Sequence, residues 1–262
     1  MSLLYSDSRK FCFIHIPKNG GSTIRNQIRG LDETGHRYDF GIPVETPLGA
    51  VQISHSPLRV VQAMYPEDID RIRRYFSFAV LRDPTSRFFS AFSQRCRRYL
   101  GREVAELSNA ERHAEIDRTI RHLQDNPDLP APDYCHFIRQ KDFVFLNGKR
   151  LLDRLYLLER MDEALADISR RIDVDLALVQ SNRTEIPRFG NLSSGLRALW
   201  RGFKPYLPGA VVAQVRRGVQ PLLYAKDGSS AIAQARDPAV LDFLRDFYRE
   251  DYALHEKVCA ET

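Results

Sequence analysis

The stretch FIHIPKNGGSTIRNQI, residues 13–28, limits the possible folds of this chain more than any other part of it. An apolar run rich in aromatic and β-branched residues ends at Pro17, as expected of a buried strand. A lysine, two glycines and two hydroxyl residues follow, and then Ile24, Ile28 and Leu31 recur at the spacing of an amphipathic helix. A strand, a glycine turn and a helix predict the start of a βαβ unit.

The same alternation continues along the chain and predicts an α/β protein with three layers, a central parallel sheet flanked by helices. Further strands are predicted at 49–56, in YFSFAVL before Arg82, and at 154–160. Helices are predicted over 84–100, 102–125, 161–172 and 237–258. Asp83 is the expected N-cap of the first of these helices, with Pro84 at its first position.

The loop between the first predicted strand and helix has the composition of an anion site. Paired glycines let the backbone approach a ligand, and the first N–H groups of a helix are unpaired. Lys18 adds a positive charge, while Ser22 and Thr23 add hydroxyl donors. The lysine precedes the glycines, so the loop differs from the Walker A pattern GxxxxGK[ST]. A tight strand-to-helix turn without a ligand is the alternative.

A second motif, VLRDPTSRFFSAF, occupies residues 80–92. Arg82 ends a predicted strand, where ligands bind in open α/β sheets, and the planar fork of arginine suits phosphate. Ser90 belongs to a polar stripe of the following helix and can join Arg82 at one phosphate. Arg87 is equally consistent with binding and with a structural ion pair. A second RDP, at 236–238, has no preceding strand and no matching serine, so it predicts only a helix start.

The two motifs resemble those of the PAPS-dependent carbohydrate sulfotransferases, the group that includes heparan sulfate 2-O-sulfotransferase. FIHIPKNGGST is similar to their 5′-phosphosulfate loop, and RDPTSRFFS to their 3′-phosphate motif RDPxxRxxS. Their loop more often has PKTGGTS, so Asn19 and the order Ser22–Thr23 depart from it. The resemblance implies a P-loop-like sulfotransferase fold and the donor 3′-phosphoadenosine 5′-phosphosulfate (PAPS), with adenosine 3′,5′-bisphosphate as product. It assigns donor binding to Lys18, Asn19, Gly20, Gly21, Ser22, Thr23, Arg82 and Ser90, and a catalytic role to Lys18.

Transfer to a hydroxyl group needs a general base, and histidine is the natural candidate. His55 follows the apolar AVQI at the end of the predicted strand 49–56. In the family that the chain resembles, a histidine at a comparable strand end is the catalytic base, so His55 is the predicted base. An ordinary loop histidine is the alternative. His15 is the competitor, but it lies within a predicted strand, where a hydrogen-bonded core histidine is expected.

These motifs together predict a PAPS-dependent O-sulfotransferase that acts on a hydroxyl of a carbohydrate or glycoconjugate. A nucleotide or small-molecule kinase with a degenerate P-loop is the first alternative. A kinase would place its lysine after the glycines and supply a carboxylate for magnesium. A nucleotide-binding scaffold without acceptor chemistry is the second alternative.

The net charge of +5 is concentrated in one segment. Between Arg188 and Lys226 there are seven lysines and arginines and no acidic residue, so general nucleic-acid binding is not expected. A single domain over 1–262 is predicted, with a basic helical insertion or lid at 188–230. This segment has three interpretations: a groove for a carbohydrate, glycolipid or polysaccharide acceptor, a contact with an anionic membrane, or an ordinary surface hairpin.

The remaining composition predicts a soluble, cytoplasmic protein, which the basic segment could bring to the inner face of a membrane. No stretch has the length of apolar sequence that a membrane span needs, and the start lacks the layout of a secretory signal. The four cysteines are scattered without a CxxC pair, and the histidines show no HxxxH spacing. Neither a disulfide framework nor a metal site is therefore expected. The cysteines are Cys12, Cys96, Cys135 and Cys259.

Overall fold

The computed structural model describes residues 2–39, 41–177, 186–187, 224–225 and 237–261. Its central sheet has the strand order β1 (Leu3–Ser6), β2 (Phe11–Ile14), β5 (Phe76–Leu81) and β8 (Arg154–Leu157). Strands β2, β5 and β8 are parallel, whereas β1 is antiparallel to β2. The α/β class is confirmed, but the prediction of a fully parallel sheet is wrong at β1. The short turn at 7–10 leaves room only for an antiparallel return.

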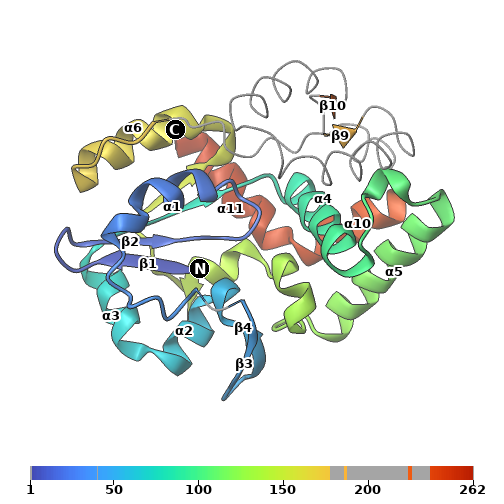
Figure 1. Cartoon of the computed structure of the whole chain (residues 1–262), viewed down its shortest axis with the longest axis horizontal. Coiled ribbons are helices and arrows are strands. Elements are labelled where there is room, and N and C mark those ends of the chain that lie inside the picture. Colours follow the sequence, from blue (N-terminus) through green and yellow to red (C-terminus); the bar gives the residue numbers. More distant parts are fainter. Residues whose placement is uncertain (1, 40, 178–185, 188–223, 226–236, 262) are drawn as a thin grey trace, which may run out of the picture.

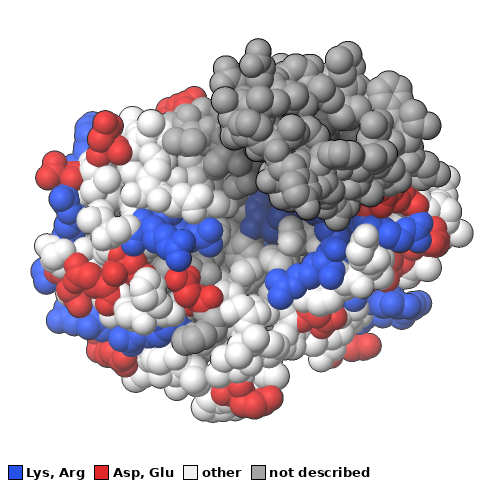
Figure 2. Space-filling model, viewed as in Figure 1, with Lys and Arg blue, Asp and Glu red and all other residues white. Residues whose placement is uncertain are grey.

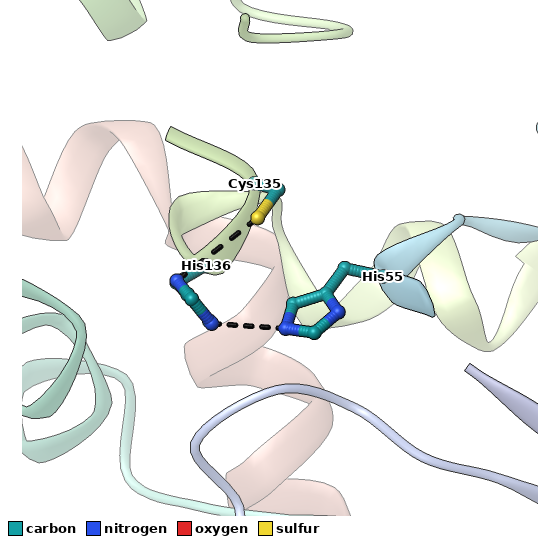
Figure 3. Close-up of side chains that lie close together, drawn as sticks. All are labelled: His55, Cys135 and His136. Carbon is teal, nitrogen blue, oxygen red and sulfur yellow. Dashed lines mark hydrogen bonds between the residues drawn. The ribbon is translucent and has the colours of Figure 1, made fainter. Parts of the chain in front are cut away.

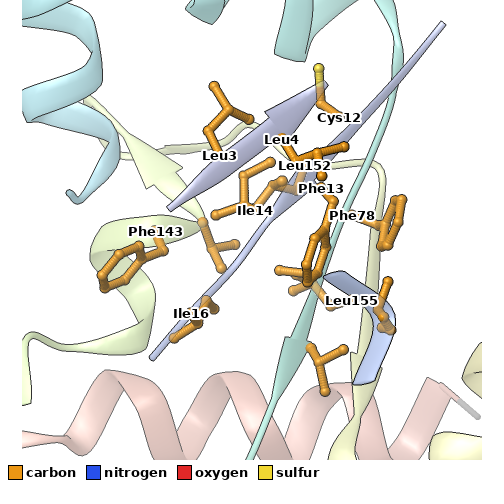
Figure 4. Packing of buried hydrophobic residues seen from close by; sticks show 14 of the residues in the cluster. Leu3, Leu4, Cys12, Phe13, Ile14, Ile16, Phe78, Phe143, Leu152 and Leu155 are labelled. Carbon is orange, nitrogen blue, oxygen red and sulfur yellow. The ribbon is translucent and has the colours of Figure 1, made fainter. Parts of the chain in front are cut away.

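Helices cover both faces of the sheet, as predicted. In Figure 1, α1 (Ser22–Ile28) and α6 (Met161–Ile172) lie on one side, and α2 (Leu58–Met64) and α3 (Pro66–Arg74) on the other. Helix α11 (Arg249–Glu261) contacts β8. The buried strand residues and the helix faces form one hydrophobic core. Figure 4 shows part of it, in which Phe13, Ile14 and Phe78 pack between the strands and the surrounding helices.

A second hydrophobic cluster lies among α4 (Pro84–Arg95), α5 (Asn109–Asp125) and α10 (Pro238–Phe247). The prediction for 84–100 is confirmed, because Asp83 accepts a hydrogen bond from Ser86 N–H and α4 continues as a π-helical turn, Cys96–Leu100. The helices predicted at 102–125 and 237–258 differ from the prediction, the first in its start and the second in its continuity. A short 3-10 turn, Val104–Glu106, precedes α5, and α5 starts at a capping box built by Ser108 and Glu111. The helix predicted at 237–258 divides at Tyr248 into α10 and α11.

The strand predicted at 49–56 does not join the central sheet. Among the strands that the structure describes, β4 (Gly49–Gln52) pairs with β3 (Pro43–Thr46) alone, in a separate hairpin closed by the hydrogen bond from Thr46 Oγ1 to the Gly49 carbonyl. After β4 the chain forms a 3-10 turn, Ile53–His55. A further small hairpin pairs β6 (Phe145–Leu146) with β7 (Lys149–Arg150). Strand β9 (Ile186–Pro187) pairs antiparallel with β10 (Tyr224–Ala225), which is distant in the sequence.

The predicted basic insertion at 188–230 lies outside the described residues, apart from 224–225. Among the helices that the structure describes, none is long and apolar enough to cross a membrane.

Candidate functional site

The loop between β2 and α1 has an unusual backbone conformation and leaves no room for a side chain at its two glycines. Lys18 and Gly20 both lie in the left-handed region, with φ of 70° and 72°. A Cβ on Gly20 would come within 2.4 Å of Leu158 Cδ1, and a Cβ on Gly21 within 2.5 Å of His15 Cδ2. The paired glycines are therefore required by packing beneath the loop, and not only by the close approach of a ligand.

The side chain of Lys18 is half-buried, and no carboxylate or other hydrogen-bond acceptor contacts its ammonium among the described residues. Burial, together with the neighbouring positive charges of Arg97, Arg82 and Arg87, lowers the pKa of Lys18 to about 8. A partly buried ammonium that is repelled by nearby guanidinium groups is costly unless an anion joins it. This part of the loop is thus organised to receive negative charge.

Further donors of the loop also lack partners within the described chain. The hydroxyls of Ser22 and Thr23, both half-buried, make no side-chain hydrogen bond there. Asn19 differs, because its side chain is fully buried and turned into the protein. Its Nδ2 donates to the Val80 carbonyl at 2.7 Å and to Gln140 Oε1 at 2.6 Å. Through these bonds Asn19 fixes the loop to the end of β5.

Arg82 follows β5 directly and lies beside the loop, as the sequence predicts. Its Nη1 donates to the Lys18 carbonyl at 3.1 Å. Its backbone N–H donates to Gln140 Oε1 at 3.1 Å, and its carbonyl accepts from Gln140 Nε2 at 2.9 Å. Burial lowers the pKa of Arg82, although Glu159 and Asp83 act against that shift. Gln140 is completely buried and therefore joins the two predicted anion motifs from inside the protein.

Ser90 lies half-buried on α4, and no contact joins it to Arg82 in the described chain. Arg87, from the same helix, is 1% exposed and structural. Its Nε donates to the Pro17 carbonyl, and its Nη2 donates to the carbonyls of His136 and Ile138. The expected acidic partner is thus replaced by backbone carbonyls. Arg87 holds the lysine–glycine loop against the segment that carries His136.

His55 lies in a small cluster with Cys135 and His136 (Figure 3). The Nε2 atoms of the two histidines are 2.9 Å apart, and their rings meet edge to face at a centroid distance of 4.6 Å. His55 Nδ1 is 3.0 Å from Ser54 Oγ. His136 comes from the 3-10 helix Pro132–Phe137, far from His55 in sequence. The sequence predicts His55, but gives no indication that His136 contacts it.

Both imidazoles are neutral at physiological pH. Burial lowers the pKa of His55 to about 3, and the positive charges of the N-terminus, Arg98 and Lys18 act in the same direction. Burial and the neighbouring His55 and Lys18 lower the pKa of His136 to about 2. One ring therefore donates its Nε2 proton to the Nε2 lone pair of the other.

The ligand atoms of His55, Cys135 and His136 lie within 4.8 Å of one another, close enough to surround a metal ion. The electrostatics oppose a cation there, because Lys18, Arg87 and Arg98 all act on His136 as positive charges. Burial also raises the pKa of Cys135 to about 12, which disfavours the thiolate that binds metals. The cluster fits a neutral acid–base pair better than a metal centre.

Arg97 and Arg98, in the π-helical turn after α4, complete the positive surroundings of Lys18 and His55. The sequence contains them in the run RCRR, which marks a basic helix end but not what that end faces. Figure 2 shows basic side chains on either side of a hollow in the described surface. The site thus combines an unpaired ammonium, several guanidinium groups and a neutral histidine pair.

This arrangement agrees with the comparison with known protein families. A family model described as the sulfotransferase family matches residues 1–257. Comparisons with curated proteins and with solved structures found no match. The match covers almost the whole chain, which therefore belongs to the sulfotransferase family, a group of transferases that move a sulfuryl group to an acceptor.

Proposed function

We propose that this protein transfers a sulfuryl group from PAPS to a hydroxyl of a carbohydrate or glycoconjugate acceptor. The observation that carries the proposal is the half-buried ammonium of Lys18, which has three arginines around it and no acidic partner among the described residues. PAPS supplies the sulfuryl group and brings negative charge at its 5′-phosphosulfate and its 3′-phosphate. Membership of the sulfotransferase family favours this chemistry over the kinase alternative.

Two groups of residues would hold the two ends of the donor. Lys18, Gly20, Gly21, Ser22 and Thr23 would bind the 5′-phosphosulfate through the ammonium, backbone N–H groups and hydroxyls. Arg82 and Ser90 would bind the 3′-phosphate. Asn19 would act through its buried hydrogen bonds, which position the loop. The bonds from Gln140 to Asn19 and to Arg82 support the proposal, since they fix one group relative to the other.

His55 would accept the proton of the acceptor hydroxyl. Its lowered pKa keeps the ring neutral in the free protein. A bound donor would bring negative charge near the ring and raise this pKa toward the range in which imidazole is an effective base. When Nδ1 carries the ring proton and donates to Ser54 Oγ, the lone pair lies at Nε2. His136 then donates its Nε2 proton to that lone pair and keeps it oriented until an acceptor hydroxyl takes its place. This role of His136 depends on the proposed role of His55.

The acceptor and the location stay predictions. The basic segment 188–226 would contact a carbohydrate, glycolipid or polysaccharide acceptor or an anionic membrane surface, and it lies largely outside the described residues. Binding to anionic and to neutral vesicles, compared with and without this segment, separates the membrane contact from the others.

Thermal-shift titration with adenosine 3′,5′-bisphosphate tests the donor. We expect the bisphosphate to stabilise the protein by about 2.7 kcal/mol at a hundredfold excess over its Kd, and ATP with or without magnesium to do much less. The Arg82→Gln variant should bind the bisphosphate about 10- to 100-fold more weakly, because a charged hydrogen bond is worth roughly 1.5–3 kcal/mol. Adenosine 5′-monophosphate, which lacks the 3′-phosphate, is the control and should bind the parent protein and the Arg82→Gln variant with the same affinity. Stabilisation by ATP alone would favour the kinase.

The pH dependence of kcat/KM tests the charge of Lys18. The pKa of this ammonium in the free enzyme is lowered to about 8, so the protonated form is lost as the pH rises through 8. We therefore expect kcat/KM to be flat between about pH 5 and 7 and to fall about tenfold per unit well above 8. Lys18→Arg should remove this fall, because arginine stays charged. A rise in kcat/KM through pH 6–7 would instead indicate a base with the ordinary pKa of histidine, in disagreement with the lowered pKa of His55.

A further inference from the structure

A second group of charged side chains lies in the loop 32–39, remote from the site described above. The loop follows the 3-10 turn Arg29–Leu31, and its residue Glu33 donates its N–H to the Tyr5 carbonyl. Tyr5 and its neighbour Ser6 face the first residues of β2, whereas Lys18 follows the last residues of that strand. The loop therefore lies at the opposite end of β2 from the sulfotransferase site.

Three donor atoms converge in this loop. His36 Nδ1 is 3.7 Å from Asp32 Oδ2 and 3.4 Å from Asp39 Oδ2, and all three atoms lie within 4.8 Å of one another. The distance to Asp32 exceeds that of a normal hydrogen bond. Ligands of a tetrahedral ion with bonds of about 2.0–2.2 Å lie roughly 3.3–3.6 Å apart. The spacing thus suits a bound ion better than direct contact.

Asp32 provides the observation that points to a ligand. Its side chain is 1% exposed, and its Oδ1 accepts a hydrogen bond from Thr34 N–H at 3.0 Å. Its Oδ2 is buried without any hydrogen-bond partner, and it is the oxygen that faces His36. A buried carboxylate oxygen left unpaired is costly, and a cation would remove that cost.

Two residues that lie between the donors in the sequence, Glu33 and Tyr38, hold the loop in place. The carboxylate of Glu33 accepts hydrogen bonds from the hydroxyls of Ser6 and Ser8. Tyr38 is fully buried and donates its hydroxyl to Asp68 Oδ2 at 2.7 Å. Among the described residues, Arg29 forms a competing ion pair: its Nη2 is 4.0 Å from Asp39 Oδ2, and its side chain is 67% exposed. An exposed guanidinium at that distance is a weak competitor.

We propose that Asp32, His36 and Asp39 form a zinc site. Two carboxylate oxygens and one imidazole nitrogen are ligands that Zn²⁺ accepts in tetrahedral geometry, with water in the fourth position. Mg²⁺ is a poorer fit, because it prefers octahedral oxygen ligands. The ion would link the two ends of the loop and stabilise the folded protein without contacting the sulfotransferase site.

Titration of the tag-free, EDTA-treated full chain with Zn²⁺ at about pH 7.5, followed by calorimetry and by Co²⁺ absorption spectra, tests the proposal. We expect one equivalent of Zn²⁺ to bind and to raise the Tm. We also expect Co²⁺ to show d–d bands without a sulfur-to-cobalt band. Asp32→Asn and His36→Gln should each weaken binding at least about tenfold, since even outer partners of a metal site have effects of that size.

Two variants serve as controls. His113→Gln removes another exposed histidine, and Cys135→Ser removes the thiol beside His55 and His136; both should bind Zn²⁺ like the parent. His36→Gln also guards against misfolding of the Asp32 variant, because the His36 side chain is 69% exposed. The proposal is overturned if Zn²⁺ does not saturate a site, if His36→Gln binds as tightly as the parent, or if Co²⁺ binding shows the sulfur band.

Discussion

Replacing His55 by alanine is expected to lower turnover by roughly 10²- to 10⁴-fold, the usual contribution of a positioned general base. The affinity for adenosine 3′,5′-bisphosphate should stay nearly unchanged, because His55 contacts Ser54 and His136 and not the lysine–glycine loop. The expected loss therefore falls on kcat. Steady-state kinetics with a panel of sugars as acceptors, together with bisphosphate titration, measures the two quantities separately.

Two comparisons separate base catalysis from general damage to the site. His113→Ala, on the exposed side of α5, is the matched control and should have parental activity. His136→Gln should lower turnover less than His55→Ala, because the proposed role of His136 is to orient the lone pair of His55. A change of less than threefold in the His55 variant would remove His55 as the base. Loss of bisphosphate binding in that variant would mean that His55 supports the fold of the site instead.

The positions of Lys18 and Arg82 relative to each other could be predicted from the sequence. Each follows a short apolar strand, and the carboxyl ends of neighbouring parallel strands meet at one edge of a sheet. The structure pairs β2 directly with β5, so that Arg82 reaches the Lys18 carbonyl. The helices at 84–100 and 161–172 could be predicted because their signals are local in sequence: the Asp83 cap and Pro84 for the first, and the apolar face for the second.

The parts of the site that could not be predicted depend on contacts between distant segments. Gln140 and His136 lie in irregular 3-10 turns without hydrophobic periodicity, so nothing local relates them to Arg82 or His55. The strand at 49–52 has the right composition for the central sheet, but the preceding residues 43–46 are close enough to pair with it first. Edge strand β1 has only four residues, all of them buried, so no alternation of apolar and polar residues distinguishes it from a terminal segment.

Replacing Lys18 by alanine is expected to lower the rate of sulfuryl transfer at least about 100-fold, because a preorganised charge in a partly buried site contributes several kcal/mol to a charged transition state. The ammonium has no acidic partner in the described chain, so its charge is not offset before the donor binds. Single-turnover kinetics at saturating donor isolates this effect from weaker binding. Lys18→Gly is the control for the backbone: it also removes the ammonium and relieves the left-handed conformation at φ 70°.

The burial of Lys18 also predicts that removing its charge stabilises the ligand-free protein. A lysine whose folded-state pKa lies below its unfolded value binds its proton less tightly when folded, so the charged form lowers stability at neutral pH. Lys18→Met keeps the apolar stem and removes the charge. It should therefore raise the Tm of the free protein while lowering the rate as far as Lys18→Ala does. Unchanged kinetics in Lys18→Ala and Lys18→Met would show that Lys18 does not belong to the site. A lower Tm in Lys18→Met would show that the ammonium of the parent protein has a stabilising partner. A gain in stability together with a loss of rate is expected only if the site destabilises the Lys18 ammonium in the free protein and stabilises it when the anionic donor is bound.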